Sequence, residues 1–299
     1  MKASSRRTFL KRSGAMAAAA LSPTWLSRRV HANPMGRPVG LQLYAVNAPL
    51  QQDPAGTLKA VKEIGFGEVE TAGFGNLTAK EFRQLLDDNG LKCPSAHLAF
   101  DLANLGPTFE TGHALGVHYV TSPVLRTSSS PPTGLGTGMT LDQAKRTAEL
   151  ANKIGEKSKQ AGFQFAYHNH HIEFVDQGGT VGYDILLRET DPHLVKFEID
   201  CGWMVVGGRN PIDYFKKYPK RFPMIHVKDF LPLDKKSNVG PEPPGAELGQ
   251  GIIDYRPIFA AAEKAGLQHY FAEQEGPFVR MNQLDAARQA YAYLHAMKN

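Results

Sequence analysis

Metal-binding side chains close four short apolar runs in the second half of the chain. These residues are His168, Asp200, His226 and Glu273, each the last residue of a run such as VKFEID or HYFAE. Side chains of a strand alternate between its two faces, so a polar residue that closes an apolar run is held at the rim of a sheet. A single His or Asp at a strand end is commonly a cap or a hydrogen-bonding group. Four of them at similar spacing indicate a site where they meet around one cation.

The first 32 residues have the features of an export signal. The segment SRRTFLK at 5–11 matches a twin-arginine signal, a mild apolar stretch covers 14–21, and small residues precede Asn33. We therefore expect residues 1–32 to be a cleavable signal peptide and residues 33–299 to be one domain in the periplasm. No apolar stretch reaches the roughly 20 residues that span a bilayer, so we expect no membrane anchor.

The positive charge of the chain comes from this first segment. The sequence holds 34 Lys and Arg against 29 Asp and Glu, a formal net charge of +5. Seven of the basic side chains and none of the acidic ones lie in residues 1–32, which leaves 27 against 29 and a net charge of −2. A slightly acidic domain lacks the attraction to phosphates that nucleic-acid binding requires, so we expect no nucleic-acid partner.

Length and cysteine content are typical of a single domain without disulfide support. About 267 residues remain after the signal, close to the roughly 250 of a barrel domain. The two cysteines, Cys93 and Cys201, lie in or beside apolar runs. We expect both to be buried free thiols rather than a disulfide pair.

Apolar runs alternate with amphipathic stretches eight times along the chain. Glycines at 65, 90, 116, 162 and 266 each follow a helical pattern and precede a strand, where a left-handed helix cap belongs. Eight strand-then-helix units predict an α/β fold, a closed (β/α)8 TIM barrel. The alternative fold is a doubly wound open sheet, which has a glycine-rich turn after its first strand. This sequence has no such turn there. The predicted strands are 39–43, 67–70, 92–97, 119–122, 163–168, 195–200, 224–228 and 269–273.

Two connections are long for barrel loops. Residues 124–139, rich in Ser, Pro, Thr and Gly, follow the fourth predicted strand, and residues 230–251 follow the seventh. Both leave from the C-terminal rim, where barrel enzymes keep their sites, so we interpret them as lids or dimer contacts.

Several motifs together resemble the xylose isomerase-like TIM barrels, the sugar phosphate isomerase/epimerase and AP endonuclease family 2 group. The resemblance covers the chain from about Val39 to the C-terminus. It rests on GLQLY at 40–44, VE at 69–70, SAH at 95–97, YHNH at 167–170, EF at 173–174, Asp200, HVKD at 226–229, LGQG at 248–251, Asp254 and Glu273.

The resemblance implies one divalent cation held by Glu, Asp, His and Glu from strands five to eight. This chain reads HNH at 168–170 where many relatives read Glu-Asn-His, so the ligand role passes to His168. The implied ligand set is His168, Asp200, His226 and Glu273. Two imidazoles and two carboxylates suit Mn²⁺, Zn²⁺, Co²⁺ or Fe²⁺ better than Mg²⁺ or Ca²⁺.

Such a site favours a sugar isomerase or epimerase. A cation bound to adjacent carbonyl and hydroxyl oxygens stabilises the enediolate that forms when the C–H proton leaves, and a nearby base takes that proton. The candidate catalytic residues are Glu273, Glu173 and His170. The candidate residues for binding a small carbohydrate are Glu70, His97, Lys228, Tyr44 and Trp203. Lys228 has a structural alternative, an ion pair with Glu198 or Asp200.

Two other functions stay open. A lyase or hydrolase of 3-keto-glycosides uses the same enediolate and differs in losing a leaving group. The change from Glu to His at position 168 makes this function a close second to the isomerase. A non-catalytic sugar-binding barrel is the third reading. Endonuclease activity is disfavoured because it requires three zinc ions and a basic face. The sequence leaves open whether the chain forms a homo-oligomer.

Overall fold

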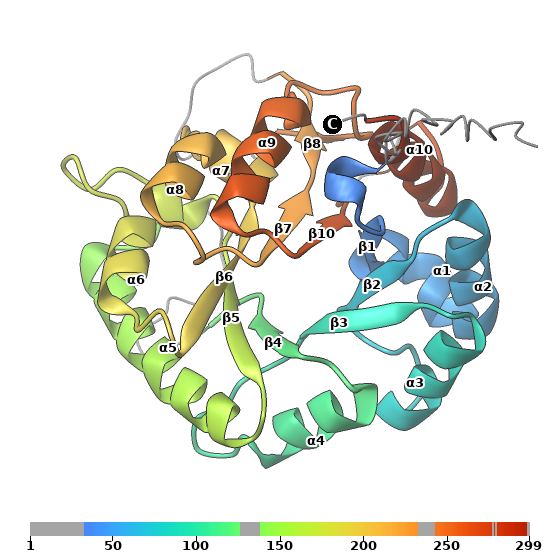
Figure 1. The fold of residues 1–299 in the computed structure, drawn as a ribbon, viewed down its shortest axis with the longest axis horizontal. Coiled ribbons are helices and arrows are strands. Elements are labelled where there is room, and N and C mark those ends of the chain that lie inside the picture. The colour runs from blue at the N-terminus through green and yellow to red at the C-terminus, as the bar shows by residue number, and fades with distance from the viewer. Residues whose placement is uncertain (1–32, 126–137, 233–242, 277, 279, 298–299) are drawn as a thin grey trace, which may run out of the picture.

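Eight parallel strands close into a barrel with helices around it (Figure 1). The structure is a computed structural model that describes residues 33–125, 138–232, 243–276, 278 and 280–297. The expected signal peptide at 1–32 lies outside these residues, as do parts of both long loops. Within the described ranges the predicted TIM barrel is confirmed.

The strands follow one another around the barrel in the order β1-β10-β7-β6-β5-β4-β3-β2. The predicted strand positions are confirmed to within a few residues. Strands β7 and β10 each end one residue before the predicted end, so Lys228 and Glu273 begin the loops after them. The bounds are β1 (Gly40–Gln42), β2 (Glu68–Thr71), β3 (Lys92–His97), β4 (Tyr119–Ser122), β5 (Gln164–His168), β6 (Val195–Asp200), β7 (Met224–Val227) and β10 (His269–Ala272).

The helices cover the outside of the barrel and have ordinary start and stop signals. Thr78 and Thr140 each form a capping box at a helix start, and Gly116 ends a helix in the left-handed conformation with φ of 68°. The α-helices are α1 (Asn47–Gln52), α2 (Pro54–Ile64), α3 (Ala79–Asp88), α4 (Gly106–Leu115), α5 (Leu141–Gln160), α6 (Gly182–Glu189), α7 (Cys201–Val206), α8 (Pro211–Lys217), α9 (Tyr255–Ala265) and α10 (Gln283–Ala296). The short 3-10 helices are η1 (Pro34–Gly36), η2 (Leu43–Val46) and η3 (Ile172–Phe174).

Apolar packing supports the barrel on both sides of the sheet. A large cluster fills the space between strands and helices, and Cys93 and Cys201 are buried in it as free thiols, as expected. A separate layer of Tyr119, Ala166, Met224 and Phe271 comes from four strands. The Phe271 ring packs edge-on against His226, at 6.2 Å between ring centroids, so this layer is in contact with the polar groups of the barrel interior. Among the described residues, no helix combines the length and the apolar character needed to cross a bilayer.

A small hairpin covers the rim beside β7. Strands β8 (Asp229–Phe230) and β9 (Gly245–Ala246) pair antiparallel. The Asp229 carboxylate accepts hydrogen bonds from the backbone N–H groups of Phe230, Gly249, Gly251 and Ile253, at 2.9 to 3.1 Å. One buried carboxylate thereby fixes the loop that leads from β9 to α9.

Candidate functional site

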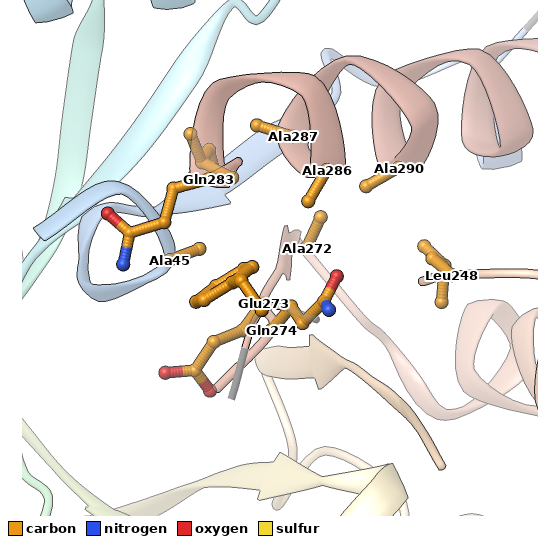
Figure 2. Close-up of a pocket in the computed structure, with 11 residues that line it drawn as sticks. Ala45, Leu248, Ala272, Glu273, Gln274, Gln283, Ala286, Ala287 and Ala290 are labelled. Carbon is orange, nitrogen blue, oxygen red and sulfur yellow. The ribbon is translucent and has the colours of Figure 1, made fainter. Parts of the chain in front are cut away.

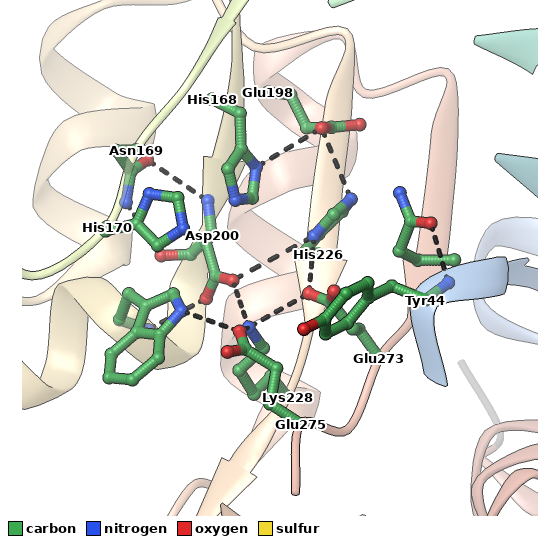
Figure 3. Close-up of polar contacts among 12 residues, drawn as sticks. Tyr44, His168, Asn169, His170, Glu198, Asp200, His226, Lys228, Glu273 and Glu275 are labelled. Carbon is green, nitrogen blue, oxygen red and sulfur yellow. Dashed lines mark hydrogen bonds and ion pairs between the residues drawn. The ribbon is translucent and has the colours of Figure 1, made fainter. Parts of the chain in front are cut away.

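Ionisable side chains fill the C-terminal part of the barrel interior (Figure 3). Residues two apart on a strand point to the same face, so Glu198 and Asp200 both face inward from β6. The strand register sets their depth. His168 is the Cα partner of Glu198, whereas Asp200 is the partner of His226. His168 therefore lies level with the deeper of the two acidic residues of β6.

Asp200, His226 and Glu273 form one group that could hold a metal ion, which we call the outer group. Their ligand atoms all lie within 4.8 Å of one another. His226 Nδ1 is 2.9 Å from Glu273 Oε2 and 3.9 Å from Asp200 Oδ2. Burial raises the pKa of the Asp200 carboxyl. Three of the four predicted ligands are thus brought together here.

Local structure holds Asp200 in place. Its Oδ1 accepts a hydrogen bond from the backbone N–H of Trp203 at 2.8 Å and so caps α7. The Asn169 side chain bonds the backbone N–H and C=O of Asp200, which ties the end of β5 to β6. The second oxygen, Asp200 Oδ2, is left facing the barrel interior without a well-formed hydrogen bond.

Lys228 contacts carboxylate oxygens of the outer group. Its Nζ lies 3.1 Å from Asp200 Oδ2 and 2.9 Å from Glu273 Oε2, and it also donates to Glu275. Burial lowers the pKa of this amine, but the three neighbouring carboxylates outweigh burial and hold the pKa above its usual range. Of the two structural pairings considered from the sequence, the structure has the one with Asp200.

Four further donors form the inner group, deeper in the barrel: His97, His168, Glu198 and His226. Glu198 Oε2 is 2.7 Å from His97 Nε2 and 3.2 Å from both His168 Nδ1 and His226 Nε2. His226 belongs to both groups, because its Nδ1 faces the outer group and its Nε2 the inner one. His168, predicted as the fourth ligand beside Asp200, is placed in the inner group.

Glu70 lies beside the inner group and is wholly buried. It accepts hydrogen bonds from Gln42 Nε2 at 2.8 Å and from the Ser95 hydroxyl, and its Oε2 is 2.7 Å from His226 Nε2 and 3.2 Å from His97 Nε2. Burial raises the pKa of Glu70, but the two histidines outweigh burial and hold it below its usual range. The sequence predicts Glu70 and His97 as sugar-binding residues, and the structure uses both of them in contacts within the protein.

Glu173 and His170 lie in the segment that follows β5. Glu173 accepts a hydrogen bond from the Tyr167 hydroxyl at 2.7 Å and one from the His170 backbone N–H at 3.0 Å. Burial raises the pKa of Glu173 to about 7 and lowers the pKa of His170 to about 3. Glu173 is only 2% exposed, so in this structure it positions the segment that carries His170.

The aromatic candidates differ in exposure. Tyr44 is 49% exposed, and its ring projects toward Glu273 at the mouth of the barrel (Figure 3). Trp203 is buried, lies 5.0 Å under the Lys228 ammonium and donates from Nε1 to Glu275 at 3.2 Å. Tyr44 is therefore the one with a face available to a ligand, and Trp203 supports Lys228.

A narrow cavity of about 10 Å³ lies between β10, η2 and α10 (Figure 2). Its walls are mostly apolar, and Ala272, Ala286 and Ala290 contribute to them. A space of that volume has room for about one water molecule. This cavity is therefore too small to hold a sugar.

Sequence reasoning did not assign Glu198, Ser95, Gln42 or Glu275 to the site. Glu198 had a signal, because it stands two residues before Asp200 in an apolar run and so shares its face. Gln42 and Ser95 likewise belong to short apolar stretches that end at the rim. Their partners come from other strands, which no local pattern reveals.

A closed parallel barrel with buried imidazoles and carboxylates at its C-terminal mouth is the architecture of a barrel enzyme. The chain belongs to the xylose isomerase-like TIM barrel family, whose sequence profile matches residues 58–297. The resemblance drawn from the motifs is thereby confirmed.

Curated relatives and a solved structure give two kinds of likeness. The inosose dehydratases of Lacticaseibacillus casei and Clostridium perfringens are 29% identical over 168 residues and 32% identical over 170 residues. Each alignment covers 53% of this chain and 56% of the relative, so the chain spans about half the length of these proteins. A sugar phosphate isomerase/epimerase structure from Parabacteroides distasonis matches with a TM-score of 0.69 and 26% identity, over 87% of this chain and 94% of that one.

Proposed function

We propose that the protein is a divalent-metal-dependent lyase that eliminates water or an alcohol from a small keto-sugar or keto-polyol. The observation that carries this proposal is the placement of the Lys228 ammonium against Glu273 at the barrel mouth, 2.9 Å apart. An elimination needs a base for the C–H proton and a donor for the departing oxygen, and this pair supplies both. The inosose dehydratases among the relatives support the same reaction class.

The isomerase or epimerase expected first from the sequence has less support. That reaction passes a proton between carbons or oxygens and commonly uses two carboxylates that flank the substrate. Here strand five offers His168, whose Nδ1 faces Glu198 in the inner group. Glu273 is left with a cationic partner instead of a second carboxylate, which suits loss of a leaving group better than a symmetric proton transfer.

The outer group fits a divalent cation. Asp200 and Glu273 offer carboxylate oxygens, His226 offers Nδ1, and Asp200 Oδ2 lacks a well-formed hydrogen bond. When bound there, such an ion supplies polarisation of the substrate carbonyl. Lys228 contacts one oxygen of each of these two carboxylates, so a bound ion and the amine would share them, and Glu275, the third partner of the amine, would keep it beside Glu273.

The proton balance follows from the charges of Lys228 and Glu273. Burial raises the pKa of Glu273, but Lys228 and His226 outweigh burial and hold it below its usual range, so the group is ionised, the form that a base requires. Once Glu273 takes the C–H proton, its negative charge beside Lys228 is gone and the ammonium becomes a better acid. Lys228 then protonates the oxygen that leaves as the C–O bond breaks. Transfer of a proton from Glu273 to the amine restores both groups.

Neighbouring residues orient these two groups. Glu275 accepts from both Lys228 and the Trp203 indole, so it keeps the amine near the mouth. The exposed Tyr44 ring offers a flat face to a sugar ring. His170 lies beside Trp203, with the ring centroids 6.2 Å apart, and its low pKa keeps it neutral as a hydrogen-bonding group. A periplasmic location, which we also propose, favours an unphosphorylated substrate.

The test is a reaction in D₂O with the metal-loaded full-length protein. An inosose, a 3-keto-glycoside and a free ketose are incubated in parallel and followed by mass spectrometry and NMR. We expect loss of water from the inosose or loss of the aglycone from the glycoside. A product of unchanged mass apart from deuterium at an isomerised carbon would replace the lyase by an isomerase. Tight binding of a sugar without any conversion would favour the non-catalytic reading.

A further inference from the structure

We infer that the inner group, His97, His168, Glu198 and His226, is a second metal site that takes a tetrahedral transition-metal ion such as Zn²⁺ or Co²⁺. The four ligand atoms lie within 4.8 Å of one another, and they come from β3, β5, β6 and β7. This site is distinct from the outer group except for His226. It does not depend on the proposed lyase reaction.

The spacing of the donors matches a four-coordinate ion. Bonds of about 2.0 to 2.1 Å in a tetrahedron place neighbouring donor atoms about 3.3 Å apart. In the inner group, Glu198 Oε2 is 2.7 Å from His97 Nε2 and 3.2 Å from His168 Nδ1 and from His226 Nε2. The ring centroids of His168 and His226 are 4.4 Å apart. A modest outward movement of the Glu198 oxygen and the His97 ring makes room for the ion.

Hydrogen bonding alone does not account for this arrangement. Three imidazole nitrogens converge on a single oxygen, Glu198 Oε2, which is more than its lone pairs accommodate well. His168 Nδ1 and Glu198 Oε1 are buried without a well-formed hydrogen bond, although His168 Nδ1 is aimed at the group. Unsatisfied buried polar atoms are costly. A metal ion bound by His168 Nδ1 and by the Glu198 carboxylate would satisfy both side chains at once.

Donor type and burial indicate which ion fits and what it does. Three imidazoles and one carboxylate suit Zn²⁺ and Co²⁺, whereas Mg²⁺ and Ca²⁺ prefer oxygen ligands. Glu198 and His226 are wholly buried, and His168 is 3% exposed. A closed site with four protein ligands is characteristic of a structural metal, so we assign the inner ion a stabilising role. Glu70 Oε2 contacts the same Nε2 atoms of His97 and His226, at 3.2 and 2.7 Å, so binding of the ion requires these two nitrogens to exchange Glu70 for the metal.

The two sites communicate through one ring. With an ion on His226 Nε2, a neutral His226 keeps its proton on Nδ1 and donates it to Glu273, 2.9 Å away. Filling both sites requires His226 to lose that proton and to bind one ion at each nitrogen. Occupancy of the inner site therefore changes the affinity of the outer group.

The experiment uses the full-length protein, stripped of metal with a chelator and titrated with Co²⁺. Four-coordinate Co²⁺ absorbs strongly in visible light, so the inner site has a signal of its own, and elemental analysis counts the ions. The variants are Glu198→Gln and His168→Asn for the inner site and Asp200→Asn for the outer group. His118→Ala, at an exposed position, is the matched histidine control.

We expect Glu198→Gln and His168→Asn to weaken the strongly absorbing Co²⁺ site by at least about 100-fold, since loss of an outer-shell partner alone costs about 10- to 100-fold. Zn²⁺ should raise the thermal midpoint of the wild type and of His118→Ala but not of these two variants. Asp200→Asn should keep the absorbing site. Full absorbance and unchanged ion count in Glu198→Gln, with circular dichroism showing a folded barrel, would overturn the inner site. An absorbing site lost only in Asp200→Asn would do so as well. Loss of the inner site with lyase activity intact leaves the proposed function standing.

Discussion

Lys228 Nζ lies 3.1 Å from Asp200 Oδ2, and both side chains are at most 2% exposed. The protein thus places a cation of its own among the carboxylates that also form the outer group. This ammonium balances the buried negative charge when no metal is bound. A divalent ion in the outer group would share these two oxygens with the amine.

Lys228→Met should make stability depend on metal. Removing the ammonium leaves Asp200 and Glu273 without their counter-charge, and breaking a buried ion pair costs about 3 to 5 kcal/mol. We expect the free energy of unfolding in chelator to fall by that amount, and Mn²⁺ or Zn²⁺ to restore part of it. Denaturant unfolding with and without metal measures both. Lys217→Met, at an exposed position, is the control. Equal loss with and without metal would contradict the shared use of these oxygens.

Glu273→Gln should lower turnover about 100- to 10,000-fold, the usual contribution of a general base, while the barrel stays folded. The amide is close in shape but cannot take the C–H proton. Initial rates on the substrate found in the D₂O experiment provide the measurement, and the thermal midpoint checks folding. Glu263→Gln on the exposed face of α9 serves as the matched change. Wild-type rates in Glu273→Gln would remove it from the mechanism.

Glu173→Gln should flatten the pH dependence of stability. Burial raises the pKa of Glu173 from 4.5 to about 7, so the folded state holds this proton more tightly than the unfolded state. The resulting stabilisation is fully present below the unfolded pKa and is lost as pH rises through about 7. Between about pH 4.5 and 7 the wild type should therefore lose up to about 3 kcal/mol relative to the variant. Parallel pH profiles of wild type and variant would show that the carboxyl is not held protonated.

Asp229→Ala should loosen the loop between β9 and α9. The change removes the acceptor of four backbone N–H groups, and leaving buried donors unpaired costs about 3 kcal/mol in total or more. Amide hydrogen exchange of Gly249, Gly251 and Ile253 should speed up well before global unfolding. Asp254→Ala removes an exposed helix cap instead and should cost only about 1 kcal/mol. Unchanged exchange in Asp229→Ala would show that other contacts hold the loop.

Much of the barrel could be predicted from the sequence because local signals were consistent. Apolar runs with helical stretches between them, and glycines such as Gly116 at helix ends, mark each strand-helix unit. The predicted and observed strands differ at their ends. The sequence predicts Lys228 and Glu273 as the last residues of their strands, but each follows the last residue that pairs with a neighbouring strand. Single-residue shifts of that kind depend on hydrogen bonds to neighbouring strands, which a sequence pattern does not contain.

The site could be predicted in part. Asp200, His226 and Glu273 meet because each closes a strand at the same rim. His168 also closes a strand, but the register pairs it with Glu198, and so it faces a deeper layer. Depth inside a barrel follows from the stagger between strands, and neither residue spacing nor residue type reports that stagger.

The seam between β1 and β10 pairs Gly40 with Phe271, residues about 230 positions apart in the chain. β1 pairs with β2 and β10, and during synthesis on the ribosome β10 is made only after almost the whole polypeptide. Glu273 follows that last strand, so it is among the last groups delivered to the mouth. A nascent chain cannot assemble the proposed catalytic pair until translation is nearly finished.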